Sequence, residues 1–118
     1  YLRTPAQVLA IQQAGLQVGF TFDTFQAAES GTDPRTLIHA MDGRLTTVHV
    51  ADYAPSGPRH LPPGQGTLDW PPILRALQAV GYDGPLILEP ACVDDVSVFL
   101  QARDFVRQVL IDVARTAG

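Results

Sequence analysis

Asp23, His49 and Glu89 are the residues of this sequence best suited to metal binding or proton transfer. Each stands at the end of a short apolar segment with the composition of a buried β-strand. If these segments are neighbouring parallel strands, their carboxyl ends lie roughly 5 Å apart and the three side chains face one volume. Two carboxylates and one imidazole suit a divalent ion such as Mn, Co, Zn, Mg or Fe. The alternative is that each is an ordinary loop residue at a strand end.

A loop of roughly 15 residues, 54–68, follows the second of these segments, and loops this long in compact domains are usually functional or mobile. It ends in Gly64-Gln65-Gly66, where both glycines are expected to serve backbone conformations with φ > 0. Asp52, just before the loop, is either a carboxylate that caps the loop or a substrate ligand, and we favour the first. We expect His60 to be an exposed loop residue without a role in the site.

Helix and strand signals alternate along the chain. Thr4, Asp33 and Asp69 have the character of helix N-caps, with Pro in the turn that follows each. Strands are expected at 16–22, 45–53 and 86–88, and a long amphipathic helix at 96–117. The inner stripe of that last helix is expected to contain Phe99, Leu100, Arg103, Val106, Leu110 and Val113.

This alternation predicts an α/β fold with a parallel sheet and right-handed crossovers. The intervals between Asp23, His49 and Glu89 each correspond to one βα unit of an eight-fold barrel, which averages roughly 31 residues. We expect residues 1–118 to form a single domain.

The composition excludes several classes of protein. With 46% apolar and 17% charged residues, the sequence is unlike a disordered chain. A net charge of −4, with only Arg among the 8 basic residues, argues against a nucleic-acid binder. No apolar run reaches the roughly 20 residues of a membrane span, and the N-terminal residues lack a signal-peptide pattern. The single Cys92 favours an inert buried thiol and a reducing compartment, the cytoplasm.

Four stretches in order resemble the xylose isomerase-like TIM barrels, a family of sugar-phosphate isomerases and epimerases with the apurinic endonuclease type as a sister branch. They are LQVGFTFDTFQ (16–26), TVHVAD (47–52), PGQGTLDW (63–70) and GYDGPLILEP (81–90). The resemblance runs from about Thr4 to Ala117. It implies a partial TIM (β/α)8 barrel that contains the last three βα units, preceded by a helix.

By this resemblance, Asp23, His49 and Glu89 hold a divalent metal, which can be Mn, Co, Mg or Zn. Glu89 would also transfer a proton at the carbon beside a ketose carbonyl, while the metal polarises the carbonyl and stabilises the enediolate. Arg59 matches a position that contacts substrate oxygens. The alternative for Arg59, a solvated loop cation, carries equal weight.

The sequence departs from the family pattern in two ways. Gln26 stands three residues after the strand Asp, where the family usually has His. Glutamine can hydrogen-bond a substrate hydroxyl, but it is not a charged acid and is a poor metal ligand. In addition, only three strands of the barrel are present, without the first metal-binding Glu of the family. An open three-stranded sheet exposes two edges and an apolar face. We therefore expect a segment of a longer barrel or a homo-oligomer paired through those edges.

The function favoured by these observations is a divalent-metal-dependent isomerase or epimerase of a sugar or sugar phosphate, incomplete in this chain alone. The first alternative is a non-catalytic barrel segment that acts as an assembly or structural unit. The second is a metal hydrolase of the apurinic endonuclease type, against which Gln26, the acidic balance and the absence of Lys all argue. The expected partner is a small-molecule sugar or sugar phosphate, and neither nucleic acid nor a membrane is expected.

Overall fold

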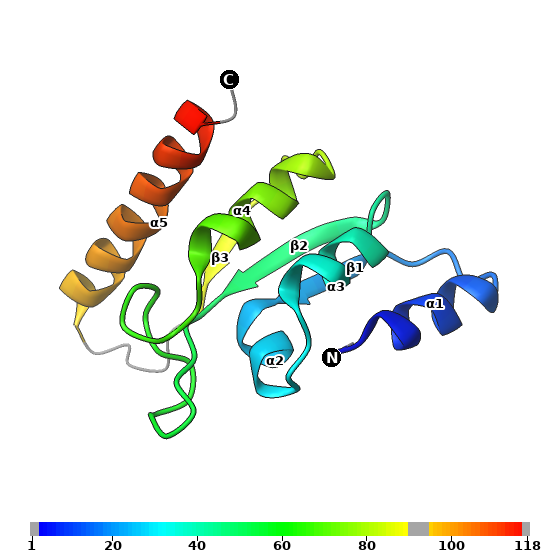
Figure 1. Ribbon diagram of the computed structural model, residues 1–118, viewed down its shortest axis with the longest axis horizontal. Helices are drawn as coiled ribbons and strands as arrows, with labels where there is room; N and C mark the ends of the chain where they lie inside the picture. Colours follow the sequence, from blue (N-terminus) through cyan, green and yellow to red (C-terminus); the bar gives the residue numbers. More distant parts are fainter. Residues whose placement is uncertain (1–2, 90–94, 117–118) are drawn as a thin grey trace.

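The computed structural model describes residues 3–89 and 95–116 and shows an α/β fold (Figure 1). The elements are α1 (Pro5–Gln13), β1 (Phe20–Asp23), α2 (Thr24–Glu29), α3 (Pro34–Ala40), β2 (Leu45–Val50), α4 (Trp70–Ala79), β3 (Leu86–Leu88) and α5 (Val96–Thr116). The expected order of strands and helices is confirmed, and the short helix α2 is an addition that the sequence patterns did not reveal. Within the described ranges, no helix is long and apolar enough to cross a membrane.

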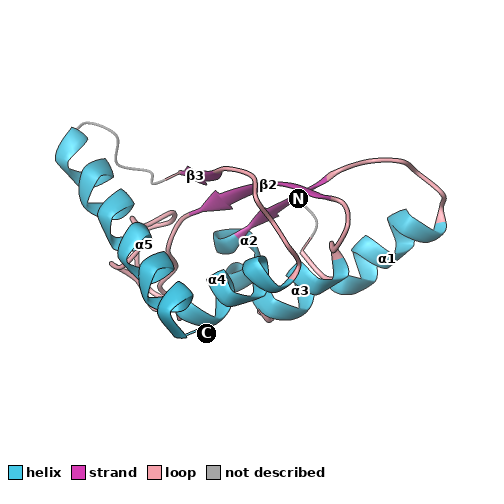
Figure 2. Cartoon of the chain, turned by 90° about the horizontal axis from the view of Figure 1, so that it is seen from above, coloured by secondary structure: helices cyan, strands magenta, loops and turns pink. Residues whose placement is uncertain are grey.

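The three strands form one parallel sheet in the order β1-β2-β3, so that β2 is central and the other two strands are edges. Figure 2 shows α1, α3 and α4 on one face of this sheet, while no described helix covers the opposite face. The structure thus has the two open edges and the one uncovered face that the sequence predicts. The carboxyl ends of all three strands lie at the same end of the sheet, as parallel pairing requires.

Only one face of the sheet is buried, although the apolar, β-branched composition of 45–50 is typical of a strand buried on both faces. Phe22, Val48 and Val50 belong to the core beneath the helices and are fully buried. His49, between the two valines, is only partly buried, and Ile87 on β3 is 40% exposed. Successive side chains of a strand point to opposite faces, and here only one face has a layer of helices against it.

The first strand begins later than expected. β1 starts at Phe20, whereas Leu16 and Val18, which the sequence placed in this strand, are 49% and 44% exposed. The apolar pattern over 16–19 does not form strand structure because the pairing of β1 with β2 begins at Phe20 opposite Leu45. Residues before that point have no neighbouring strand to pair with in the described sheet.

The predicted N-caps all precede helices, although only two make side-chain cap bonds. Thr4 Oγ1 accepts a hydrogen bond from the Gln7 backbone N–H at 3.3 Å, and the Gln7 side chain accepts one from the Thr4 N–H at 3.2 Å. This reciprocal pair is a capping box. Asp33 caps α3 through the Arg35 N–H at 2.9 Å. Asp69 occupies the N-cap position of α4 without a side-chain bond.

Helix α5 has nearly the predicted length but buries only part of the predicted stripe. Its buried residues are Ala102, Val106 and Val113, whereas Leu100 and Leu110 are 44% and 41% exposed. The helix packs chiefly against α4 and also touches β3. A narrow line of small side chains is enough to meet those neighbours, which leaves the larger leucines outside.

The connection from β2 to α4, residues 51–69, contains no regular element apart from an isolated antiparallel bridge between Asp52 and Leu61. Gly64 has the expected positive φ, at 96°. Gly66 does not, so the expectation for that residue is wrong. Instead, a Cβ atom at Gly66 would lie 2.5 Å from Asp52 Oδ1, and glycine is needed because the backbone approaches this carboxylate closely. Cys92 lies outside the described residues.

Candidate metal centre

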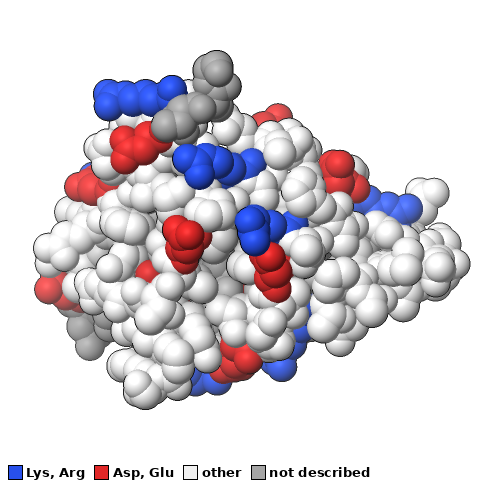
Figure 3. All heavy atoms as spheres, in the orientation of Figure 1, with Lys and Arg blue, Asp and Glu red and all other residues white. Residues whose placement is uncertain are grey.

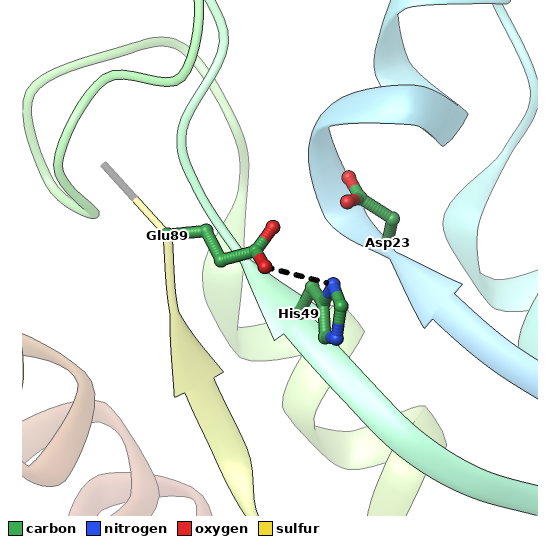
Figure 4. Close-up of side chains that lie close together, drawn as sticks. All are labelled: Asp23, His49 and Glu89. Carbon is green, nitrogen blue, oxygen red and sulfur yellow. Dashed lines mark ion pairs between the residues drawn. The ribbon is translucent and has the colours of Figure 1, made fainter. Parts of the chain in front are cut away.

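Asp23, His49 and Glu89 converge at the carboxyl end of the sheet, each at the end of a different strand (Figure 4). One ligand atom from each residue lies within 4.8 Å of those of the other two, so the group is compact enough to share one cation. Asp23 is buried, whereas the side chains of His49 and Glu89 are 21% and 38% exposed. The group is therefore accessible to a small molecule from the side of His49 and Glu89.

Strand pairing brings these side chains together. Asp23 lies directly opposite His49 in the β1–β2 register. Glu89 continues the ladder one residue beyond β3, because its backbone N–H donates to the Val50 carbonyl at 3.0 Å. The backbone hydrogen bonds of the sheet thus fix where the three side chains originate.

His49 and Glu89 lie within ion-pair distance of one another without forming a hydrogen bond, the contact that Figure 4 marks. His49 Nδ1 is 3.2 Å from Glu89 Oε1, yet the angles are not those of a hydrogen bond, and this buried nitrogen has no hydrogen-bond partner among the described residues. A buried nitrogen without a partner is costly, and a cation between the two atoms would satisfy both. The donor set of two carboxylates and one imidazole therefore fits a divalent ion such as Mn, Co, Mg or Zn.

Asp23 also organises the helix that follows it. Its Oδ1 atom accepts a hydrogen bond from the Gln26 backbone N–H at 2.9 Å, which makes Asp23 the N-cap of α2. A carboxylate has about four acceptor positions on two oxygens, so capping does not exhaust its capacity to hold a cation. The candidate metal centre and α2 therefore share one residue.

Gln26, predicted as a substrate ligand, is buried beside this cap at 7% exposure. The backbone N–H of Gln26 donates to the Asp23 carboxylate, and the side-chain Oε1 of Gln26 has no hydrogen-bond partner in the part of the chain that the structure describes. A buried amide oxygen without a donor is unusual, because such groups are nearly always paired. The side chain of Gln26 thus has an unused hydrogen-bond acceptor three residues after Asp23 in the chain.

Arg59, the other predicted substrate ligand, contacts α2. Its guanidinium forms an ion pair with Glu29, including a contact from Nη2 to Oε1 of 3.3 Å, and lies 4.8 Å from the centre of the Phe25 ring. The next residue, His60, stacks on the same ring with centroids 4.1 Å apart. His60 is half-buried and has a φ of 55°, so the expectation of an exposed loop residue is wrong.

Phe25 and Glu29 are the residues of this region that sequence reasoning missed. They lie on α2, whose six residues are too few to display a helical apolar pattern. Their partner Arg59 is 30 residues away from Glu29 along the chain, so no local motif connects them. The single sequence signal was the Asp followed by Thr at the end of β1, a pattern typical of a helix N-cap.

Comparison with known proteins gives consistent matches. A family model described as "Xylose isomerase-like TIM barrel" matches residues 2–109. An inosose dehydratase of Lacticaseibacillus casei is 29% identical over 110 residues, covering 75% of this chain and 37% of that protein. An L-ribulose-5-phosphate 3-epimerase of Shigella boydii is 30% identical over 78 residues, covering 64% of this chain and 28% of that protein. The chain thus spans well under half the length of these relatives.

The solved structures show the same architecture. The crystal structure of a D-tagatose 3-epimerase-like protein superposes on 98% of this chain with a TM-score of 0.81, at 21% sequence identity. The match covers 43% of that solved chain. At this level of identity the similarity concerns the fold, which this chain shares with a part of the larger structure.

Proposed function

This chain belongs to the xylose isomerase-like TIM barrel family and forms part of such a barrel, and we propose that it contributes the metal site of a divalent-metal-dependent sugar or sugar-phosphate isomerase or epimerase. The observation that carries the proposal is the grouping of Asp23, His49 and Glu89 within 4.8 Å. The relatives named as an inosose dehydratase and a ribulose-phosphate epimerase support a polyhydroxylated substrate with a carbonyl group.

In this proposal Asp23, His49 and Glu89 hold Mn, Co, Mg or Zn. An ion held by these residues would supply Lewis-acid polarisation of the substrate carbonyl. Glu89 removes the proton from the carbon beside that carbonyl, which suits the more exposed of the two carboxylates. Inversion at that carbon and loss of water from the neighbouring one both begin with this proton removal.

Gln26 and Arg59 bind the substrate hydroxyls. The buried Oε1 of Gln26 accepts a hydrogen bond from one hydroxyl, which satisfies the atom that has no protein donor. Arg59 has five N–H donors, of which Glu29 engages only some, so the guanidinium can donate to a substrate oxygen while it keeps its ion pair.

The test follows proton transfer directly. The intact protein is incubated with Mn²⁺ and a panel of ketoses and ketose phosphates in D₂O, and deuterium incorporation beside the carbonyl is measured by NMR. We expect exchange in the native protein and a loss of at least about a hundredfold in Glu89→Gln, because general acid–base groups contribute that much or more. Asp83→Asn, an exposed carboxylate outside both the metal group and the Arg59 contacts, should retain exchange.

The products separate the reactions that this step can start. Recovery of an epimerised or isomerised sugar supports the proposal, and loss of water would assign the dehydratase reaction instead. If calorimetry detects no Mn²⁺ binding and no substrate undergoes exchange, the chain is the non-catalytic structural segment of the first alternative.

A nuclease function is less well supported. Gln26 is not a zinc ligand, and the net charge of −4 disfavours phosphate-backbone binding. On the face shown in Figure 3, acidic and basic side chains are interspersed and no broad basic surface is formed. Retention of DNA that weakens with added salt would reverse this preference.

The open edges β1 and β3 and the uncovered sheet face point to further protein around this unit. We propose that a second copy of the protein covers them, because exposed strand edges readily pair with other strands. Light scattering of the intact protein at micromolar concentration tests this assembly. A clean monomer would contradict it and leave the covering strands to the same polypeptide.

A further inference from the structure

We propose that Asp52 is a positioning residue, whose buried carboxylate folds the 51–69 loop into the shape that presents Arg59 to the substrate. The proposal rests on the substrate-binding role given above to Arg59. It concerns a residue outside the metal group, and it can be tested by a measurement that does not depend on catalysis.

The carboxylate of Asp52 is fully buried, and its acceptor positions are filled by the loop backbone and by Trp70 at the start of α4. Oδ1 accepts hydrogen bonds from the backbone N–H groups of Tyr53 at 2.8 Å and Leu68 at 3.1 Å. Oδ2 accepts one from the Gly64 N–H at 2.8 Å and one from the Trp70 indole N–H at 3.0 Å. An ionised carboxylate has about four acceptor positions, so none remains for a substrate hydroxyl. Asp52 therefore acts on the substrate only through what it holds in place.

These bonds join distant points of the loop to one centre. The backbone of Asp52 also pairs with Leu61, with N–O distances of 2.6 Å and 3.1 Å. Gly66 passes so close that it has no room for a Cβ beside the carboxylate. Residues 61–68 of the loop are thus wrapped around the side chain of Asp52.

Arg59 and His60 directly precede the bridged residue Leu61, so this wrapping sets where they emerge. Both then rest on Phe25 of α2, and Arg59 also binds Glu29. The loop is consequently fixed at two places, at its base by Asp52 and at its tip by α2. Asp23 of the candidate metal centre is also the N-cap of α2. The tip of the loop, with Arg59 and His60, therefore rests on the helix that begins at the metal centre.

The variant Asp52→Asn tests the base of the loop with almost no change in shape. It replaces one oxygen by an NH₂ group, so two of the four N–H donors face another donor and lose their acceptor. Asp83→Asn, at an exposed position, is the matched control for loss of a negative charge. Trp70→Phe removes only one donor and serves as a second, milder variant if Asp52→Asn does not fold.

Trypsin provides a readout of loop order that is independent of activity. The sequence has no Lys, and Arg59 is its sole tryptic position between Arg44 and Arg75. In the intact protein, cleavage after Arg59 should become at least about tenfold faster in Asp52→Asn, because lost hydrogen bonds to a charged group shift local opening by that factor or more. Cleavage after Arg44 and Arg75 should not change. The Asp83→Asn control should behave as the native protein does.

Binding measurements then separate positioning from general stability. The Mn²⁺ affinity of Asp52→Asn, measured by calorimetry, should stay within about twofold of the native value, whereas the KM for the ketose should rise about tenfold. Adding Arg59→Gln to Asp52→Asn should raise KM little further, because the effects of coupled residues are not additive. Unchanged cleavage after Arg59, additive losses, or equal losses of Mn²⁺ and ketose binding would each overturn the proposal. If the native protein exchanges no ketose proton, the proposed function fails, and trypsin cleavage alone decides the role of Asp52.

Discussion

His49 Nδ1 and Glu89 Oε1 lie 3.2 Å apart on neighbouring strands, although the angles do not form a hydrogen bond. Backbone pairing between β2 and β3, continued by the Glu89 N–H to the Val50 carbonyl, sets this spacing. The two atoms are therefore held close together by the sheet without satisfying one another. Such an arrangement favours a cation that accepts electron pairs from both.

His49→Ala should weaken Mn²⁺ binding by at least about tenfold, because even outer partners of metal ligands cost that much when removed. Titration calorimetry on the intact protein measures the effect. His39→Ala is the matched control, since His39 is exposed on α3, and its affinity should equal that of the native protein. Equal affinities for the two variants would remove His49 from the site.

Leu74→Ala should lower the free energy of unfolding by about 2–5 kcal/mol, the usual cost of truncating a buried leucine. Leu74 is 2% exposed and lies in the core beneath the sheet. Leu9 has the same side chain but is 51% exposed on α1. Leu9→Ala should therefore change stability by no more than about 0.5 kcal/mol in denaturant titrations.

Gly64→Ala should destabilise the protein more than Gly15→Ala. Both glycines have positive φ, 96° and 74°, so both substitutions carry the backbone penalty of about 1–2 kcal/mol. A Cβ at Gly64 would also lie 2.9 Å from the Phe105 ring, whereas nothing lies within 4 Å of one at Gly15. Thermal melting of the two variants isolates this steric part, and identical melting temperatures would show that the ring moves aside freely.

Asp33 should stabilise the fold in a pH-dependent way. The side-chain hydrogen bond from Arg35 lowers the pKa of Asp33 below its ordinary value of 3.8, with a further contribution from the Arg35 backbone N–H. The stabilisation is therefore fully present above that ordinary value and is lost as the pH falls through the lowered pKa of the folded state. Its size is small, because exposed ion pairs are screened by water.

Chemical denaturation across acidic pH checks this sign. Asp33→Asn keeps a capping side chain but removes the charge, so its stability should fall below that of the native protein near neutral pH and converge with it in strong acid. Arg35→Gln should reduce the pH-dependent gap. A gap that widens as the pH falls would contradict the argument.

The sequence predicted the parts of this fold that local patterns determine. Alternating helices and strands, the Thr4 and Asp33 caps, and the meeting of Asp23, His49 and Glu89 all follow from periodicity and parallel pairing. Burial was predicted less well, as the exposed Leu100 and Leu110 of α5 show. Which face of a helix is buried depends on how many neighbours it has, and periodicity does not give that number.

The loop contacts could not be predicted at all. The Asp52 carboxylate gathers donors that are 12, 16 and 18 residues away in the chain. His60 owes its burial to Phe25, which belongs to α2, a helix too short to show a helical pattern in the sequence. Partners of this kind are brought together only when the whole sheet edge has formed.

Trp70 donates its indole N–H to Asp52 and is 2% exposed, and it is the one tryptophan in the sequence. When the protein is excited beyond the absorption band of its three tyrosines, its fluorescence consequently originates from the junction where strand, loop and helix meet. A shift of that emission to longer wavelength signals water entering this junction. Stopped-flow mixing can therefore time the closing of the loop base separately from assembly of the rest of the sheet.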